Sequence, residues 1–215
     1  MRIRTTSTTF ADTIEPALPT SRQASHQERS VLAVLRSKAP RRALLPLEAE
    51  QIAEWQASAL LAMAGLQAPP TPASLISQLP RVLVRAQPDV PASACSDWHS
   101  GRWLIWINSS EPATRQIFSL FHEYKHVIDH PQRALLYQGD HARSEAAADY
   151  FAACLLMPRA WVKRAWAEGH QNVSDLADLF EVHPRAMARR LAHLGLGATR
   201  IAADGERMRA GRSDT

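Results

Sequence analysis

The sequence contains little cysteine and no long apolar run. Two cysteines, Cys95 and Cys154, are too few for a disulfide framework in 215 residues, and no CxxC motif is present. No stretch of about 18 or more apolar residues occurs, so no segment is predicted to cross a membrane. The first residues lack the apolar core of a secretory signal peptide. These absences predict a soluble, cytoplasmic protein.

The composition is that of an ordinary globular chain with a weak basic charge. Apolar residues make up 46% of the sequence, and its length suits one sizeable domain with a small appendage. A net charge of +4 is compatible with nucleic acid nearby but too small to predict it. We divide the chain into a flexible tail over 1–27, a main domain over 28–169, a small helical subdomain over 170–202 and a flexible tail over 203–215.

One short stretch, His122-Glu123-Tyr124-Lys125-His126, has the form HExxH. Residues four apart lie on the same face of a helix, so both histidines can direct their imidazoles at one point, with Glu123 beside it. Two imidazoles, a carboxylate and an open position are what a hydrolytic zinc site needs. The motif alone is a weak signal, because so short a pattern occurs by chance in many helices.

The predicted helix that carries this motif, over about 112–129, has its apolar side away from the histidines. At about 100° per residue, the apolar stripe centres nearly opposite His122 and His126. That arrangement is typical of a helix that lines a cleft. Arg115 and Lys125 are predicted to be surface residues of the same helix. The stripe consists of Ile117, Leu120, Phe121, Tyr124 and Ile128.

A second helix, predicted over about 141–156, supplies acidic residues at the same spacing. Glu145 and Asp149 are four residues apart and therefore share a face. The surrounding alanines allow this helix to approach the first one closely. Glu145 is then a candidate third zinc ligand, and Asp149 a candidate acceptor for the ring N–H of a ligand histidine. The alternative for Glu145 is a solvated helix acid, paired with Arg143 or with nothing.

These two helices together resemble the ImmA/IrrE family of zinc metallopeptidases. That family combines HExxH with a second helix of the form ExxA(N/D)xFAxxLLMP, which the stretch 145–158 matches. The resemblance implies an α+β, minimal zincin-like core, in which a small twisted sheet packs on the active-site helices. It also implies one zinc ion held by His122, His126 and Glu145, with Glu123 as the catalytic base.

Three further residues are weighed as parts of this site. His130 continues the four-residue spacing, but eight residues rise about 12 Å along a helix, too far for a third ligand of one ion. We interpret it as a residue of the helix C-terminus. His141 and Tyr137 are candidates for stabilising the transition state, and for both of them a structural or solvent-exposed role is the alternative.

The region before the motif predicts a small sheet. One strand is expected over 81–85, and a hairpin over 94–107 turns at Ser100-Gly101. The strand that carries Trp103, Ile105 and Ile107 is predicted to be the sheet edge above the cleft. An extended substrate would bind this edge by strand addition.

The C-terminal part suggests a competing function. Helices over 173–180 and 184–194 resemble a helix-turn-helix, with Arg185, Arg189 and Arg190 on the second helix. Against DNA binding, Glu181 occupies the turn where such units usually have glycine. We therefore favour packing against the core as the role of these helices.

The sequence thus predicts a zinc-dependent metallo-endopeptidase that hydrolyses a peptide bond of a protein substrate. The resemblance implies that this substrate is a helix-turn-helix repressor or an antitoxin-type regulator, about which the sequence itself is silent. Direct nucleic-acid binding is not favoured, and no membrane partner is expected. The alternative is a DNA-binding transcriptional regulator with a structural, non-catalytic zinc site.

Overall fold

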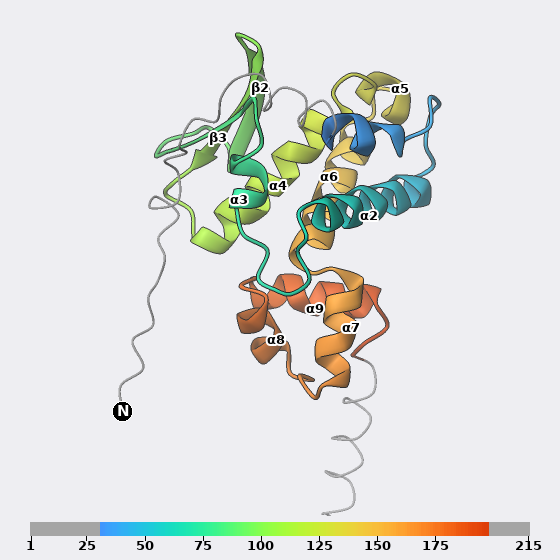
Figure 1. Ribbon diagram of the computed structural model, residues 1–215, viewed down its shortest axis with the longest axis vertical. Coiled ribbons are helices and arrows are strands. Elements are labelled where there is room, and N and C mark those ends of the chain that lie inside the picture. The colour runs from blue at the N-terminus through green and yellow to red at the C-terminus, as the bar shows by residue number, and fades with distance from the viewer. Residues whose placement is uncertain (1–30, 198–215) are drawn as a thin grey trace, which may run out of the picture.

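The computed structural model describes residues 31–197 and consists of a small sheet surrounded by helices (Figure 1). The predicted tails over 1–27 and 203–215 lie outside these residues. Residues 31–37 are helical. The elements that follow are α2 (Pro46–Met63), α3 (Ser74–Ser77), β1 (Val82–Gln87), β2 (Ala94–His99), β3 (Arg102–Asn108), α4 (Ala113–Asp129), α5 (Arg133–Tyr137), α6 (His141–Leu156), α7 (Arg159–Ala167), α8 (Val173–Leu179) and α9 (Pro184–His193).

The sheet has three strands in the order β1-β3-β2. The predicted hairpin is confirmed, because β2 pairs antiparallel with β3 through a turn in which Ser100 and Gly101 both have positive φ angles. β1 lies parallel to β3 on its other side, so β3 is the central strand.

The prediction that β3 forms the sheet edge is therefore wrong. Hydrogen bonding on both sides leaves its backbone no free edge for a substrate, and the side chains of Trp103, Ile105 and Ile107 are buried in the core. The local hairpin was visible in the sequence, but the parallel pairing with β1 joins segments about twenty residues apart and was not. Among the described strands, β2 has the free edge that lies next to α4.

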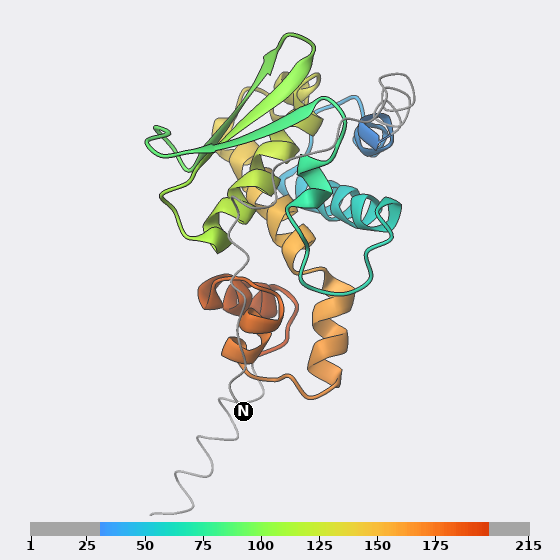
Figure 2. The same cartoon turned by 60° about the vertical axis from the view of Figure 1, so that its left-hand side comes forward.

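The helices α4 and α6 lie side by side under the sheet, and α2 covers α6 (Figures 1 and 2). The predicted apolar stripe of α4 is buried from Leu120 to Ile128, while Ile117 is partly buried. α6 contributes Ala148 and Ala152, which have no exposed surface. Small side chains at these positions let the two helices approach each other, as the sequence predicted.

The prediction that Lys125 is a surface residue is wrong. Its Nζ donates to both carboxylate oxygens of Asp129 at 2.7 Å, and the Tyr137 hydroxyl donates to the same carboxylate at 2.6 Å. All three side chains are buried. Burial lowers the pKa of Lys125 and raises that of Tyr137. The charge is tolerated inside the protein because every member of this buried cluster has a partner.

The helices α7, α8 and α9 form the lower part of the molecule in Figure 1. Arg190 of α9 is buried and donates its Nε–H to the Met157 carbonyl at 2.9 Å. Glu181, in the turn between α8 and α9, has the left-handed backbone (φ 51°) that glycine adopts most readily. None of the helices over residues 31–197 combines the length and the apolar character that a membrane span requires.

Candidate metal centre

The side chains of α4 and α6 bring three ligand-type atoms to one point. The Nε2 atoms of His122 and His126 are 3.1 Å apart. One carboxylate oxygen of Glu145 lies 3.2 Å from the first of these atoms, and the other oxygen lies 3.2 Å from the second. Around a tetrahedral zinc ion with bonds of about 2.0 Å, ligand atoms are separated by about 3.3 Å. The three residues therefore fit a single zinc ion.

The position of Glu145 follows from the start of α6. Asp140 caps this helix by accepting a hydrogen bond from the backbone N–H of Arg143 at 3.1 Å. Glu145 then lies in the second turn, on the face that approaches α4, with its side chain 36% exposed. The sequence predicted this juxtaposition from the helical spacing within each motif and from the alanines around Glu145, and the structure places the three residues together as candidate ligands.

The orientation of the His122 ring is fixed by a hydrogen bond at its second ring nitrogen, Nδ1. Its Nδ1 lies 2.8 Å from Oδ1 of Asp149, one turn after Glu145 on α6. Burial would lower the pKa of His122, but the hydrogen bond and negative charge of Asp149 outweigh it and raise the pKa above its ordinary value. With the proton held on Nδ1, Nε2 presents a lone pair toward Glu145 and His126.

His126 lacks such an acidic partner on its second nitrogen among the described residues. Burial and the nearby His122 lower its pKa to about 4. A neutral imidazole is the form that binds a metal ion. Near neutral pH, His126 is therefore ready to act as a ligand without first losing a proton.

Glu123 lies beside these atoms and is nearly buried, with 9% of its surface exposed. Burial raises the pKa of its carboxyl group, and a hydrogen bond of 2.6 Å from the Ser96 hydroxyl opposes this change. Ser96 belongs to β2, so the free edge strand holds the carboxylate of α4 in position. Nothing in the sequence indicates this role of Ser96, because a single serine in a strand carries no local signal for a contact across 27 residues.

Other charged residues surround Glu145. The Nε2 of His141, which is the first residue of α6, lies 3.5 Å from its carboxylate. An Arg133 nitrogen lies 3.7 Å from Oε1 of Glu145, the oxygen that His141 also approaches. His141 thus lies next to the candidate ligand Glu145, and its role in stabilising a transition state stays a prediction. Arg133 was missed, since nothing in its neighbourhood of the sequence distinguishes it from a surface arginine.

Two other candidates lie elsewhere. The hydroxyl of Tyr137 is directed into the buried cluster and bound to Asp129, so it is not available to a transition state. That prediction is wrong, because α5 turns the side chain inward. His130 is the C-cap of α4, as expected, and its ring contacts Trp103 with centroids 4.9 Å apart.

Comparison with known proteins identifies the family of this chain. The family model of the IrrE N-terminal-like domain, which defines the peptidase M78 family, matches residues 80–192. The chain belongs to this family, as the resemblance predicted. Membership suggests a metallopeptidase and implies a metal ion, and His122, His126 and Glu145 form a possible site for it.

A solved structure supports the same fold. A Mycobacterium tuberculosis transcriptional regulator is similar to this chain with a TM-score of 0.53 and 15% sequence identity. The similarity covers 79% of this chain and 62% of the regulator, so the chain spans less than two thirds of that protein. No curated protein matches the chain.

Proposed function

We propose that this protein is a zinc-dependent metallo-endopeptidase. The observation that supports the proposal is the convergence of two imidazole nitrogens and a carboxylate, 3.1–3.2 Å apart, next to the nearly buried carboxylate of Glu123. A zinc ion held there by His122, His126 and Glu145 would supply a Lewis acid that polarises water and the substrate carbonyl.

In this proposal, the residues of the chain divide the remaining work. Glu123 accepts the proton of the attacking water and delivers it to the leaving nitrogen, which suits a carboxylate whose pKa is raised by burial. Ser96 keeps that carboxylate aimed by its hydrogen bond. Asp149 holds the proton of His122 on Nδ1. His141 and Arg133 are positioned to interact with negative charge that develops on the substrate.

The substrate is proposed to bind as an added strand on β2. This strand pairs with β3 on one side, and among the described strands it has no neighbour on the other. An extended peptide on that edge would pass Ser96 and therefore Glu123. The cleavage site must then lie in a loop or in a segment that can become extended.

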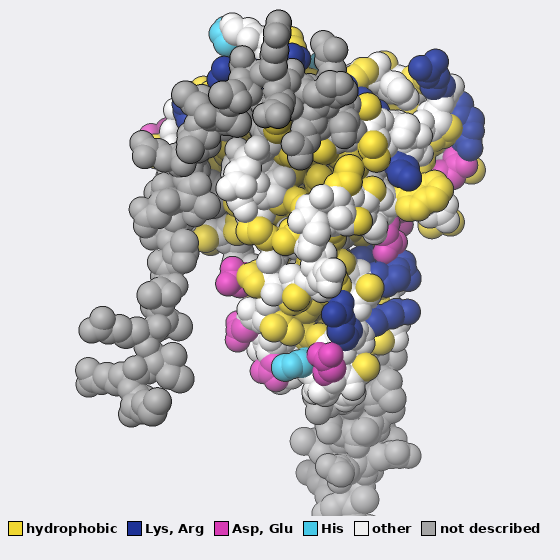
Figure 3. Space-filling model, in the orientation of Figure 1, with side chains coloured by type: hydrophobic (Ala, Val, Ile, Leu, Met, Phe, Trp, Pro, Cys, Tyr) yellow, Lys and Arg dark blue, Asp and Glu magenta, His cyan; other side chains and the backbone are white. Residues whose placement is uncertain are grey.

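We further propose that the substrate is a helix-turn-helix repressor or an antitoxin-type regulator. The support is the ImmA/IrrE resemblance, which the family match bears out. The alternative, a DNA-binding regulator with a structural zinc site, is less well supported. Arg190 is buried and therefore cannot contact DNA, and in Figure 3 acidic as well as basic side chains lie on the surface of the part that the C-terminal helices form.

The decisive experiment uses Glu123→Gln. This variant should retain about one zinc ion per chain, because Glu123 is not among the candidate ligands, and should cleave its substrate about 10²–10⁴ times more slowly. Metal analysis and a cleavage assay measure the two effects. Glu145→Gln is the matched comparison, and it should lose zinc as well as activity.

Two results would contradict the proposal. The enzyme hypothesis fails if the purified protein binds no zinc even after reconstitution. The regulator alternative replaces it if the biological effect survives Glu123→Gln while DNA binding can be measured directly.

A further inference from the structure

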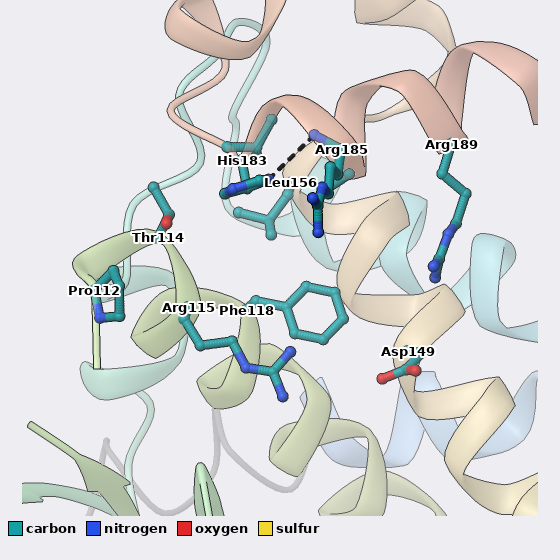
Figure 4. Close-up of a pocket in the computed structure, with 11 residues that line it drawn as sticks. Pro112, Thr114, Arg115, Phe118, Asp149, Leu156, His183, Arg185 and Arg189 are labelled. Carbon is teal, nitrogen blue, oxygen red and sulfur yellow. Dashed lines mark hydrogen bonds between the residues drawn. The ribbon is translucent and has the colours of Figure 1, made fainter. Parts of the chain in front are cut away.

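A cavity of about 340 Å³ lies beside the candidate metal centre, between the first turns of α4, the end of α6 and the start of α9. Its floor is apolar and is formed by Phe118, Leu156 and Val182. Three arginines surround it: Arg115 from α4, and Arg185 and Arg189 from α9 (Figure 4). We call it the arginine cavity.

The positive charge of the arginine cavity is incompletely neutralised. Arg115 is held near Glu111, with 3.6 Å between the charged groups, and lies over the ring of Phe118. Arg185 and Arg189 are exposed, and over residues 31–197 neither side chain forms an ion pair. They lie four residues apart, on the face of α9 that points toward Phe118 and Asp149 in Figure 4.

The single acidic residue of the lining is Asp149, and its carboxylate is already engaged by His122. The same cavity also touches Phe118, whose ring centroid lies 6.4 Å from that of His122. The arginine cavity therefore adjoins the candidate metal centre and carries a surplus of positive charge.

The direction of β2 relates the cavity to a bound substrate. Ser96 of this strand contacts Glu123, whereas Ser93, three residues earlier, accepts a hydrogen bond from Arg115 at 3.2 Å. β2 thus approaches the candidate metal centre from the side of the arginine cavity, over a distance of about 10 Å. A peptide that pairs antiparallel with its free edge runs the opposite way. Its residues after the scissile bond would pass the arginines.

We propose that the arginine cavity recognises an acidic side chain of the substrate, located two to five residues after the scissile bond. The guanidinium groups bind the carboxylate, and the apolar floor accepts the aliphatic part of that side chain or of its neighbour. This inference rests on the proposed peptidase function, and it identifies the substrate segment as an acidic one.

Peptide profiling tests the preference. The zinc-loaded protein is incubated with a peptide mixture from a digested proteome, and the cleaved products are sequenced by mass spectrometry. Aspartate and glutamate should be enriched about tenfold at one position two to five residues after the cleaved bond, as a charge-assisted hydrogen bond predicts. Arg185→Gln combined with Arg189→Gln should remove the enrichment. Arg185→Glu combined with Arg189→Glu should replace it with a preference for lysine and arginine.

Lys163→Gln is the control, because this exposed lysine lies on α7 outside the cavity lining. It removes one positive charge and should leave the preference unchanged. Zinc content and melting temperature show whether each variant is folded. Cleavage without any acidic preference, or a preference that the double variant retains, overturns the inference while leaving the peptidase function intact.

A binding measurement tests the acidic preference of the arginine cavity separately from the peptidase function. Glu123→Gln is titrated with fluorescein-labelled peptides in which one glutamate moves along an otherwise neutral sequence. The glutamate peptides should bind about tenfold more tightly than the matched glutamine peptides, and only while Arg185 and Arg189 are present. Equal affinity contradicts the inference. If the wild-type protein cleaves no peptide, the proposed peptidase function is contradicted. The binding measurement still shows whether the arginine cavity recognises an acidic side chain.

Discussion

The helix α4 carries two charged clusters that differ in almost every physical respect. The candidate metal centre, formed with Glu145 of α6, is partly exposed, and its nitrogen and oxygen atoms point at one another. The buried cluster of Lys125, Asp129 and Tyr137 is closed, and its charged groups form short hydrogen bonds with one another. The two clusters are only one turn apart.

The difference shows what separates a candidate site from a structural ion pair. In the buried cluster, a donor faces an acceptor at each contact, so nothing further is needed. In the candidate metal centre, the two Nε2 atoms face each other and the carboxylate of Glu145. A hydrogen bond between the two rings requires that one Nε2 is protonated and the other is not. An arrangement of acceptors around a common point is completed by a cation.

The largest predicted effect concerns the buried cluster. Lys125→Met leaves the carboxylate of Asp129 buried without its cation, and we expect the free energy of unfolding to fall by about 3–5 kcal/mol. Urea denaturation measures this change. Adding Asp129→Leu and Tyr137→Phe removes the stranded groups and should restore part of the loss. A fall of less than about 1 kcal/mol for Lys125→Met would show that the two clusters do not differ in this way.

The next effect concerns the candidate metal centre, whose contribution should depend on the ion. Zinc at about a thousand times its dissociation constant should stabilise the wild-type protein by about 4 kcal/mol. Glu145→Gln should abolish this stabilisation yet change the metal-free protein by no more than about 0.5 kcal/mol, because the side chain is partly exposed. Thermal denaturation with and without zinc measures both. Glu168→Gln, at the exposed C-cap of α7, should retain the full response, and an equal loss there would argue against a specific site.

The smallest effect tests an intermediate case, the partly exposed pair of Glu54 on α2 and Arg159 on α7. The hydrogen bond from Arg159 lowers the pKa of Glu54 below its ordinary value of 4.5. A lowered carboxyl pKa stabilises the fold above about pH 4.5, and this contribution is lost as the pH falls through the folded-state pKa.

Arg159→Gln removes this exposed partner and should therefore cost about 1 kcal/mol or less at pH 7, and less than that at about pH 3, where Glu54 is more fully protonated. Denaturation of both proteins at the two pH values gives the comparison. A difference that stays constant with pH would mean that the charge of Glu54 contributes nothing to stability. It would also mean that the effect of the three charged clusters on stability does not follow their degree of burial.

Much of the site could be predicted because helical spacing is a local property. HExxH and the Glu145–Asp149 pair each fix a helix face within five residues, and the stretch 145–158 is specific enough to indicate the family. The helix bounds of α6 and the hairpin also followed from local signals. The position of β3 did not, because strand order depends on which distant segment pairs with it.

Lys125 shows the other limit. Its charge predicts exposure, but Asp129 one turn later and Tyr137 on another helix together make its burial possible. The contact between Ser96 and Glu123 depends in the same way on how the sheet lies over α4. Contacts between side chains from separate elements are decided by packing, for which a single sequence carries no periodic signal.

The buried cluster also has a mechanical meaning. A helix that slips by one residue turns by about 100° and moves about 1.5 Å along its axis, which would swing both histidines away from Glu145. The hydroxyl of Tyr137 on α5 donates a hydrogen bond to Asp129 of α4. Arg36 donates to the carbonyl oxygens of Val127 and Ile128 at the end of α4. These contacts act as a rotational lock: they fix the C-terminal end of α4, so that His122 and His126 keep their direction toward Glu145.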